Sequence, residues 1–556
     1  MTQRSGGRIL VDQLLIQETE RLACVPGESY LAVLDALHDA KIDVLVCRNE
    51  GGAAMMAEAY GKLTGKPGIC FVTRGPGATN ASHGVHIAAQ DSTPMILFIG
   101  QVERSMRERE AFQEVDYKAF FGSMAKWVVE VDSAARLPEL VARAYRIACQ
   151  GRPGPVVVAL PEDVLTEMAD VPDAPKVAPA EAWPGPDDMN RFGDMLRKAK
   201  KPLVILGGSR WSEAARKSLI AFSEKFALPI TTSFRRAHLF PSDHPNYVGD
   251  VGIGPNPKLA RRVKEADLLV LLGARMSEMP SSAYSLIDVP VPRQTLVHIH
   301  PGSEELGKVY QPALAIQAAP NAFCAALAEL AHPNDAPWAG ATKEARLEFL
   351  DWTDKPAKLP GKFQYGEVMR WLSDQLPGEA IITNGAGNYA IWIHRYYRFR
   401  KLGTQLAPTS GSMGYGVPAA VMAKRQYPDR PVIAFAGDGC FMMNGQEFAT
   451  AVQYGIALIV IVVDNSMYGT IRMHQERDYP GRISATLLKN PDFAAYARAF
   501  GGHGERVETT DDFAPAFERA VRSGKPAILH CLIDPEAITP SRTLSQIRDE
   551  ALKSGK

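Results

Sequence analysis

The sequence predicts an α/β protein made of three doubly wound domains, each built on a parallel sheet. The chain has 556 residues, which corresponds to about three or four domains of ordinary size. Along much of it, short apolar runs that suit buried strands alternate with segments of helical periodicity. This alternation is typical of a parallel sheet with helices on both faces.

The composition is that of a globular protein without a strong overall charge. Hydrophobic residues make up 46% and charged residues 22% of the chain, as in ordinary soluble domains. Lys and Arg together number 62, as do Asp and Glu, so no global field favours nucleic acid or a membrane surface. No apolar run has the length of a membrane span, and the amino terminus lacks a signal-peptide pattern. The seven cysteines are scattered without metal-ligand spacing, which predicts reduced thiols in a cytoplasmic protein.

The first domain is expected over residues 7–175. The pattern predicts helices at Ile9–Glu20, Gly52–Leu63 and Ser82–Gln90. It predicts strands at Arg21–Val25, Ile42–Cys47, Gly68–Val72 and Met95–Ile99. The segment Val171–Pro186 is rich in Pro, Ala and Asp, which indicates a linker.

Two further domains and a tail are expected after the linker. The second domain covers residues 188–335, with predicted strands at Pro202–Leu206, Pro229–Thr232, Leu268–Leu272 and Thr295–His298. A boundary near Pro333–Lys362 precedes a third domain over residues 363–540. The tail, residues 541–556, carries a charged helix that either closes over an active site or packs on the surface.

The stretch Pro431–Arg472 carries the strongest functional signal. An apolar run at Pro431–Ala436 ends at Gly437-Asp438-Gly439, a helical segment follows at Gln446–Tyr454, and a second apolar run at Ile456–Val463 ends at Asp464-Asn465. This pattern predicts a strand–helix–strand unit with polar residues after both strands. In open α/β sheets, ligands bind at the carboxyl ends of the strands.

The residue types at these two strand ends suit a metal ion and a phosphate group. Asp438 offers a carboxylate and Asn465 an amide oxygen, both hard ligands for a Mg²⁺ ion that also takes phosphate oxygens. Gly437 and Gly439 let backbone N–H groups approach a phosphate closely. The alternative is an ordinary tight turn, and the Asn at the end of the next strand favours the metal site over it.

At this spacing, Gly437-Asp438-Gly439 and Asp464-Asn465 resemble the signature of thiamine-diphosphate enzymes. The surroundings resemble the acetohydroxyacid (acetolactate) synthase branch over nearly the whole chain. The resemblance implies a pyrimidine-binding, a central Rossmann-like and a diphosphate-binding domain, with thiamine diphosphate and Mg²⁺ as cofactors. It implies Asp438, Asn465 and the backbone carbonyl of Met467 as metal ligands. It also implies a homodimer or homotetramer with active sites at the subunit interface, acting on a small-molecule substrate.

Glu50, which follows the expected strand Ile42–Cys47, resembles the glutamate that activates the cofactor in this family. By that resemblance it bonds the aminopyrimidine ring, whose imino tautomer deprotonates C2 of the thiazolium to give the ylid. A solvated glutamate at a strand end is the ordinary alternative. By the same resemblance, Gln113 faces the reacting carbon and Lys126 lies in the substrate channel.

The other candidate cofactor residues come from the same resemblance. The run from Gly75 and Pro76 to Asn80 matches the segment beside the pyrimidine ring, and its Gly-Pro-Gly is expected to form a turn. Met413, next to Gly411, matches the residue that props the cofactor in its bent form, although a lone Met is more often core filler. The implied diphosphate contacts are Ala386, Gly387, Asn388, Tyr389, Gly439, Cys440, Met467, Tyr468, Gly469 and Thr470.

Two departures from the synthase pattern bear on substrate and cofactor. Synthases usually have Met where this chain has Thr470, and Trp where it has His474. That Trp helps to select the second oxoacid, whereas His474 is smaller, polar and able to titrate, so the usual acceptor is not implied. The flavin-binding segments are replaced by Gly249–Gly254 and Arg275–Met279, where only the first arginine of the synthase run remains. We therefore expect no stoichiometric FAD.

Three functions remain open from the sequence. The first is a 2-oxoacid decarboxylase and carboligase that transfers a carbanion–enamine unit to a second carbonyl. The alternative is a decarboxylase or carbon–carbon lyase similar to oxalyl-CoA decarboxylase or 2-hydroxyacyl-CoA lyase, in which His474, His83 or His86 supplies a proton. The third is a non-catalytic homologue, which the presence of Glu50 disfavours because a binder does not need the activating glutamate.

Overall fold

The computed structural model describes residues 3–330 and 336–555, and contacts between residues group them into two compact units. The first unit contains the residues up to 180 together with 408–427 and 444–456, and the second contains 181–407, 428–443 and 457 onward. Within these described residues there are three six-stranded parallel sheets, one in the first unit and two in the second. The predicted α/β fold class is therefore confirmed.

The sheet of the first unit has the strand order β3-β2-β4-β5-β7-β6. Every residue of the central strands β4 and β5 is buried, as in parallel sheets that are covered on both faces. The strands are β2 (Arg21–Cys24), β3 (Asp43–Val46), β4 (Gly68–Val72), β5 (Met95–Gln101), β6 (Trp127–Glu130) and β7 (Pro155–Pro161), with an antiparallel pair of β1 (Arg4–Ser5) and β8 (Met168–Ala169).

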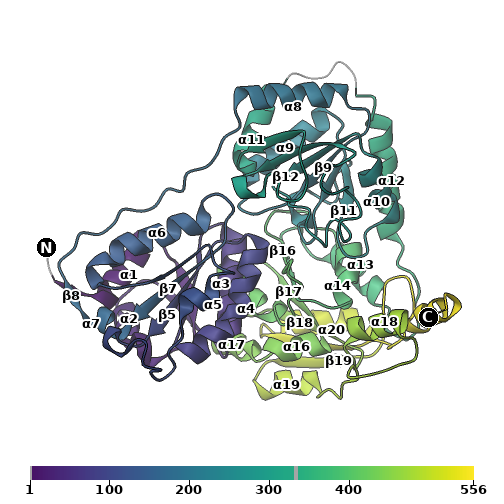
Figure 1. Ribbon diagram of the computed structural model, residues 1–556. Coiled ribbons are helices and arrows are strands. Elements are labelled where there is room, and N and C mark those ends of the chain that lie inside the picture. Colours follow the sequence, from purple (N-terminus) through teal and green to yellow (C-terminus); the bar gives the residue numbers. More distant parts are fainter. Residues whose placement is uncertain (1–2, 331–335, 556) are drawn as a thin grey trace. The chain divides into compact units, whose positions relative to one another are not determined.

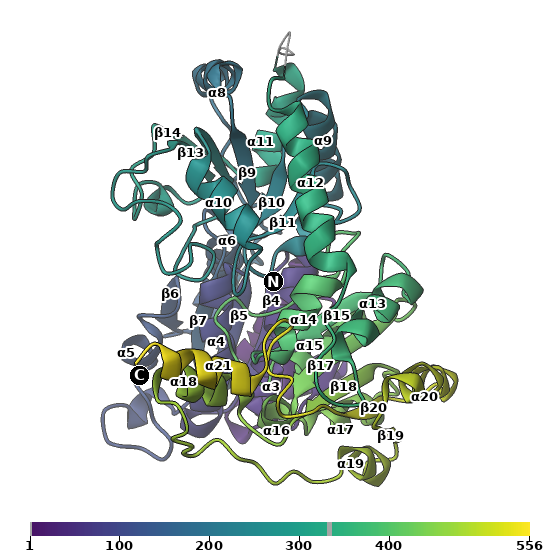
Figure 2. The ribbon, with the colours of Figure 1, turned by 90° about the vertical axis from the view of Figure 1, so that its right-hand side faces the viewer.

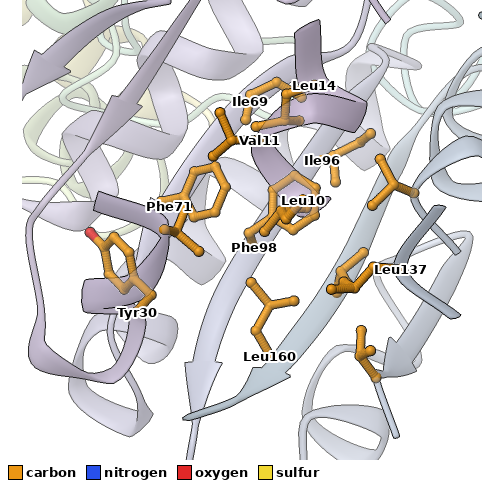
Figure 3. Close-up of a cluster of buried hydrophobic side chains, with 14 of the residues drawn as sticks. Leu10, Val11, Leu14, Tyr30, Ile69, Phe71, Ile96, Phe98, Leu137 and Leu160 are labelled. Carbon is orange, nitrogen blue, oxygen red and sulfur yellow. The ribbon is translucent and has the colours of Figure 1, made fainter. Parts of the chain in front are cut away.

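Helices cover both faces of this sheet. On one face, α1, α2, α6 and α7 bury their apolar side chains against the strands (Figures 1 and 3), where the rings of Phe71 and Phe98 stack with centroids 4.7 Å apart. On the other, α3 and α4 pack against each other, and α15, from the last third of the chain, packs on α3. The helices are α1 (Gly6–Ile16), α2 (Leu31–His38), α3 (Glu50–Thr64), α4 (Gly75–Asp91), α5 (Tyr117–Phe121), α6 (Leu137–Cys149), α7 (Glu162–Thr166), α15 (Gly416–Gln426) and α17 (Glu447–Gln453).

The first sheet of the second unit is central in the sequence and has the strand order β11-β10-β9-β12-β13-β14. Its strands are β9 (Pro202–Leu206), β10 (Ile230–Thr232), β11 (Tyr247–Asp250), β12 (Leu268–Leu272), β13 (Thr295–His300) and β14 (Leu314–Gln317). Its helices are α8 (Pro186–Lys198), α9 (Glu213–Lys225), α10 (Pro257–Glu265), α11 (Pro320–Ala326) and α12 (Ala339–Asp354).

The other sheet of the second unit has the order β16-β15-β17-β18-β20-β19. Its middle strands β17 and β18 pair in parallel, which confirms the predicted strand–helix–strand unit. Its strands are β15 (Ile381–Asn384), β16 (Gln405–Leu406), β17 (Val432–Gly437), β18 (Ile459–Asp464), β19 (His503–Val507) and β20 (Ala527–Leu532). Its helices are α13 (Tyr365–Gln375), α14 (Tyr389–Tyr396), α16 (Asp438–Asn444), α18 (Gly469–Asp478), α19 (Phe493–Ala499), α20 (Thr510–Arg522) and α21 (Leu544–Lys553).

The C-terminal tail packs on helix α18 within the second unit. Figure 2 shows α21 beside α18, and an apolar cluster joins Ile538, Leu544 and Ile547 to Met467. The carboxylate of Glu476 is fully buried between arginines of α18 and α21, and the ion pair with the α21 arginine lowers its pKa to about 2. The tail therefore packs against a helix that carries predicted site residues, and its closing over an active site stays a prediction.

Most expected elements are confirmed, and the differences are unpredicted strands and earlier helix starts. The linker has no helix or strand over residues 170–185, and β4, β9 and β12 have the predicted bounds. Strands β6, β7, β11, β14, β16, β19 and β20 were not predicted, and α3, α4 and α16 begin at Glu50, Gly75 and Asp438, where strand ends and turns were expected. The expected boundary near residues 333–362 begins in residues 331–335, outside the described part, so the domain limits stay a prediction. No helix among the described residues has the length and apolar character needed to cross a bilayer.

Candidate active site

The predicted site residues form two groups, one in each unit. The first half-site, in the first unit, consists of Glu50, Gly75, Pro76, Asn80, Gln113, Gly411 and Met413. The second half-site, in the second unit, consists of Ala386, Gly387, Asn388, Tyr389, Asp438, Gly439, Cys440, Asn465, Met467, Tyr468, Gly469, Thr470 and His474.

Glu50 is the first residue of helix α3, which corrects the expectation of a strand end. Asn49 is the N-cap, and its side-chain oxygen accepts a hydrogen bond from the Gly51 N–H at 2.8 Å. An Asn before a Glu is a readable helix-start signal, and it explains the difference. The Asn80 amide Nδ2, from the first turns of α4, donates to Oε2 of Glu50 at 2.9 Å. Two residues that the resemblance placed beside the pyrimidine ring are thus in direct contact.

The Gly-Pro-Gly segment is the start of helix α4, which corrects the expectation of a turn. Pro76 lies in the first helical turn, where its fixed φ and missing N–H cost little. The Gly75 N–H donates to the Gln113 carbonyl at 2.9 Å, and a Cβ at Gly75 would lie 2.8 Å from that oxygen. Gln113 itself has a φ of 64°, a left-handed conformation that non-glycine residues rarely adopt. Such local strain is concentrated at functional positions.

Two charged residues that the sequence analysis did not assign hold the Gln113 loop. The carboxylate of Glu114 accepts the N–H groups of Glu108 at 2.8 Å and Ala111 at 3.1 Å, which lowers its pKa. The guanidinium of Arg74 is buried, donates to the Phe112 carbonyl at 3.5 Å and forms an ion pair with Glu162. The Arg74–Glu162 pair joins distant parts of the sequence, so no local sequence pattern marks it.

The segment of residues 408–415, which carries Gly411 and Met413, is tied to α3 and α4 by buried charges. The Tyr415 hydroxyl donates to Oε2 of Glu58 at 2.5 Å. Asp91 accepts a backbone N–H of the segment at 2.7 Å. Lys62 neutralises both carboxylates, with its Nζ 3.1 Å from Glu58 and in contact with Asp91. The segment is therefore fixed within the first half-site.

In the second half-site, β17 ends at Gly437 and α16 begins at once with Asp438. The Asp438 carboxylate is 3% exposed, and burial, together with the nearby carboxylate of Asp464, raises its pKa to about 6. Asn490, which the sequence analysis missed, donates from Nδ2 to Oδ2 of Asp438 at 2.7 Å and to Oδ1 of Asp464 at 2.8 Å. A buried carboxylate of this kind is stabilised by a cation.

Asp464 anchors the turn that presents Asn465. Its oxygens accept the Ser466 N–H at 2.8 Å, the Asn490 amide at 2.8 Å and His530 Nε2 at 2.9 Å. Burial alone would raise the pKa of Asp464, but these hydrogen bonds hold it below its usual range. The Asn465 side chain forms no hydrogen bond to any residue that the structure describes, so its amide oxygen is available to a ligand.

The backbone carbonyl of Met467 is also available. The neighbouring N–H of Tyr468 donates to the Thr486 carbonyl at 2.8 Å, and the N–H of Leu488 donates to the Ser466 carbonyl at 2.9 Å. These two bonds pair the strand segments on either side of Met467 without using its own carbonyl. The arrangement fits the third metal ligand that the resemblance implied.

The predicted diphosphate loop uses its side chains for internal contacts. Tyr389 is 7% exposed, and its hydroxyl lies 3.3 Å from Sγ of Cys440. The Asn388 amide Nδ2 donates to the Ile538 carbonyl, just before the C-terminal tail, at 2.9 Å. These side chains are thereby engaged within the protein, and the predicted phosphate contacts are left to the loop backbone, in which Gly387 has a φ of 142°.

The two residues that depart from the synthase pattern lie on α18. The Thr470 hydroxyl donates to Oδ1 of Asn388 at 2.9 Å. His474 is half-buried, and its shielded Nδ1 has no hydrogen-bond partner in the described parts of the chain. Burial and the charge of Arg477 lower the pKa of His474, so the ring is mainly neutral at pH 7.

Three other basic residues named in the sequence analysis, Lys126, His83 and His86, take no part in the half-site contacts described above. The Lys126 amine donates to the carbonyls of Ile147 and Gln150 at 2.5 and 2.6 Å, at the end of α6. It therefore caps a helix C-terminus, and its assignment to a substrate channel stays a prediction. His83 and His86 are both exposed on α4.

The donor set of the second half-site fits Mg²⁺. A buried carboxylate (Asp438), an unpaired amide oxygen (Asn465) and an unused carbonyl (Met467) are all hard oxygen donors. Mg²⁺ favours a few such protein ligands and completes its shell with phosphate oxygens and water. The first half-site offers a carboxylate that is already hydrogen-bonded to an amide, which suits a group that shares a proton with a ligand.

Replacement of Asn490 by Ala is expected to weaken Mg²⁺ binding about 10- to 100-fold, because partners of metal ligands contribute at that level. The variant leaves two buried carboxylates without the amide between them. Titration of the apoenzyme with Mg²⁺ at fixed thiamine diphosphate, followed by tryptophan fluorescence, measures the affinity. The control is Asn246→Ala, which removes a hydrogen bond from a side-chain amide to the Ser223 carbonyl in the central sheet region. Equal affinity of the folded Asn490→Ala variant and the parent protein would contradict the assignment.

Comparisons with known proteins agree with this geometry. Three family profiles, described as the N-terminal TPP binding domain, central domain and C-terminal TPP binding domain of thiamine pyrophosphate enzymes, match residues 4–120, 189–327 and 385–531. The acetolactate synthase isozyme 2 large subunit of Escherichia coli (strain K12) is 32% identical over 95% of this chain and 96% of its own length. The acetolactate synthase large subunit of Parasynechococcus marenigrum (strain WH8102) is 33% identical over 94% and 87%, respectively. The chain therefore belongs to the thiamine pyrophosphate enzyme family, in its acetolactate synthase-like branch.

Proposed function

We propose that this protein is a thiamine-diphosphate- and Mg²⁺-dependent carboligase that decarboxylates a 2-oxoacid and joins the product to a second carbonyl compound. The observation that carries the proposal is the contact between Glu50 and Asn80 at 2.9 Å. A protein that only binds the cofactor does not need a carboxylate placed for proton sharing. The names of the relatives, acetolactate synthase large subunits, support the same reaction class.

Each half-site has its own task in this proposal. Bound thiamine diphosphate supplies a carbon nucleophile and an electron sink, the chemistry that a 2-oxoacid needs to lose CO₂. Asp438, Asn465 and the Met467 carbonyl would hold Mg²⁺, which would supply positive charge for the diphosphate. Glu50 holds a proton against the pyrimidine ring, and Gln113, on its strained backbone, faces the substrate.

The assembly follows from the resemblance to the family. We propose a homodimer or homotetramer in which the first half-site of one subunit and the second half-site of another form one active site. In this arrangement two chains contribute to each reaction, and neither half-site is sufficient alone.

The second candidate is a decarboxylase or carbon–carbon lyase, and His474 favours it. A half-buried imidazole with an unpaired Nδ1 stands where synthases usually have Trp. What favours this candidate is the replacement of the Trp that helps synthases to select the second oxoacid. Because its pKa is lowered, His474 itself is suited to accept a proton more than to supply one. Formation of acetaldehyde from pyruvate, without a coupled product, would favour this reading.

We predict that the purified protein carries no stoichiometric flavin. The glycines that stand in place of the synthase flavin loop are used for packing: a Cβ at Gly252 would lie 2.5 Å from the Phe234 ring, and one at Gly249 would lie 3.3 Å from Phe349. Met276, in the second segment, is fully buried. An absorption spectrum of the purified protein tests the prediction, and one equivalent of flavin per subunit would contradict it.

The proposed reaction is tested with a panel of 2-oxoacids, including pyruvate, in the presence of thiamine diphosphate and Mg²⁺, with and without an aldehyde acceptor. We expect release of CO₂ and a coupled product. Replacement of Glu50 by Gln removes the proton-sharing group and is expected to lower turnover by about 10²- to 10⁴-fold while cofactor binding persists. The matched control is Glu20→Gln, on the surface of the same unit. Unchanged turnover in Glu50→Gln would rule out the role given to Glu50.

A further inference from the structure

Glu447, on α17, is a fully buried carboxylate with three hydrogen-bond donors. Its Oε1 accepts the backbone N–H of Arg48 at 3.0 Å and of Asn49 at 2.9 Å. Its Oε2 accepts the hydroxyl of Thr450 at 2.6 Å. All of these residues belong to the first unit. The two N–H groups directly precede Glu50, so the carboxylate binds the backbone where α3 begins.

The same helical segment closes an open sheet edge. Strand β3 is the last strand on its side of the sheet, so its outer N–H and C=O groups have no neighbouring strand to pair with. The hydroxyl of Tyr454 accepts the Val46 N–H at 2.9 Å and donates to the Val44 carbonyl at 3.2 Å. Glu447 continues this pairing beyond the end of β3, where the chain turns toward Glu50.

The fit between Glu447 and the start of α3 is close. A Cβ at Gly52 would lie 2.6 Å from Oε1 and 2.8 Å from Cγ of Glu447, so only a glycine permits this approach. The residue before Glu50 is held twice, because the N–H of Asn49 is bound by Glu447 and its side chain caps the helix at Gly51. The backbone at Glu50 is thus fixed from two directions.

We infer that Glu447 is a positioning residue for Glu50. It acts through the backbone that precedes Glu50, and so fixes the point from which the Glu50 carboxylate reaches Asn80. The inference rests on the proposed role of Glu50 in proton sharing. Displacement of a reacting group by about 1 Å can cost about 10²-fold in rate, so a backbone anchor at this place affects catalysis without touching the substrate.

Two substitutions of Glu447 distinguish the effect of its hydrogen bonds to the backbone from the effect of its negative charge. In Glu447→Gln the amide oxygen still accepts both backbone N–H groups, and the Thr450 hydroxyl can turn to accept from the new amide nitrogen. In Glu447→Ala the two N–H groups lose their acceptor. Positioning therefore predicts that the Gln variant keeps the function and that the Ala variant loses it, whereas a role of the negative charge predicts that both variants fail.

The first measurement is made on the apoenzyme. Hydrogen–deuterium exchange of peptides that contain residues 48–52 is expected to be at least about tenfold faster in Glu447→Ala than in the parent protein, and nearly unchanged in Glu447→Gln. On the holoenzyme, Glu447→Ala is expected to lower kcat about 10²-fold with KM and cofactor affinity little changed. The exchange rate of the C2 proton of bound thiamine diphosphate, followed by NMR, should fall in parallel with kcat.

The control is Glu348→Ala, which removes a half-buried carboxylate paired with Arg262 at 2.7 Å in the second unit. It is expected to leave exchange at residues 48–52 and kcat unchanged. Parent-like exchange and kcat in Glu447→Ala would overturn the inference, as would equal losses in the Gln and Ala variants. If the parent protein turns over no 2-oxoacid, the proposed function fails, while exchange at residues 48–52 in the apoenzyme still decides whether Glu447 anchors this backbone.

Discussion

The predicted site depends on one carboxylate, that of Asp438, which is almost completely buried. Asp438 directly follows a central strand, is 3% exposed and is linked to a second buried carboxylate, that of Asp464, through the Asn490 amide. Such a group is stable as an anion only where donors or a cation compensate for lost hydration. The parallel pairing of β17 and β18 places Asp438 and the Asp464 turn at the same edge of the sheet. The proposed metal site therefore agrees with the topology and with the cost of a buried charge.

The same physical principle recurs in acidic side chains, most of them buried, that fix loops. Glu114 binds the loop of Gln113, Glu58 binds the segment of Met413, Asp464 binds the turn of Asn465, and Glu447 binds the backbone before Glu50. In each case a carboxylate accepts hydrogen bonds that the loop cannot satisfy with its own backbone. The predicted site residues are thus held by residues that have no predicted role in the reaction. These supporting residues fix the geometry of the site.

The sequence was sufficient for most of the central strands and for the polar residues that follow them, but not for the contacts that hold these residues. Apolar runs located β4 and β12 to the residue, because central parallel strands are buried on both faces. Helix starts at Glu50 and Gly75 were missed, although Asn49 and Pro76 are local signals for them. Asn490 lies 52 residues from Asp438 and Glu447 lies 398 residues from Asn49, and single-sequence patterns contain no information on such distant partners.

The central proposal is that Glu50 of one chain and Asp438 of another act together, as the resemblance to the family implies for these two residues, which fall in separate units of the chain. Glu50→Gln and Asp438→Asn chains with different tags can be co-expressed, and the mixed dimers purified through both tags. Each mixed dimer then has one site with both substitutions and one site with neither, so the account predicts about half of the parental turnover, although each variant alone is inactive. Mixed dimers as inactive as either variant would contradict it and would place the whole site within one chain.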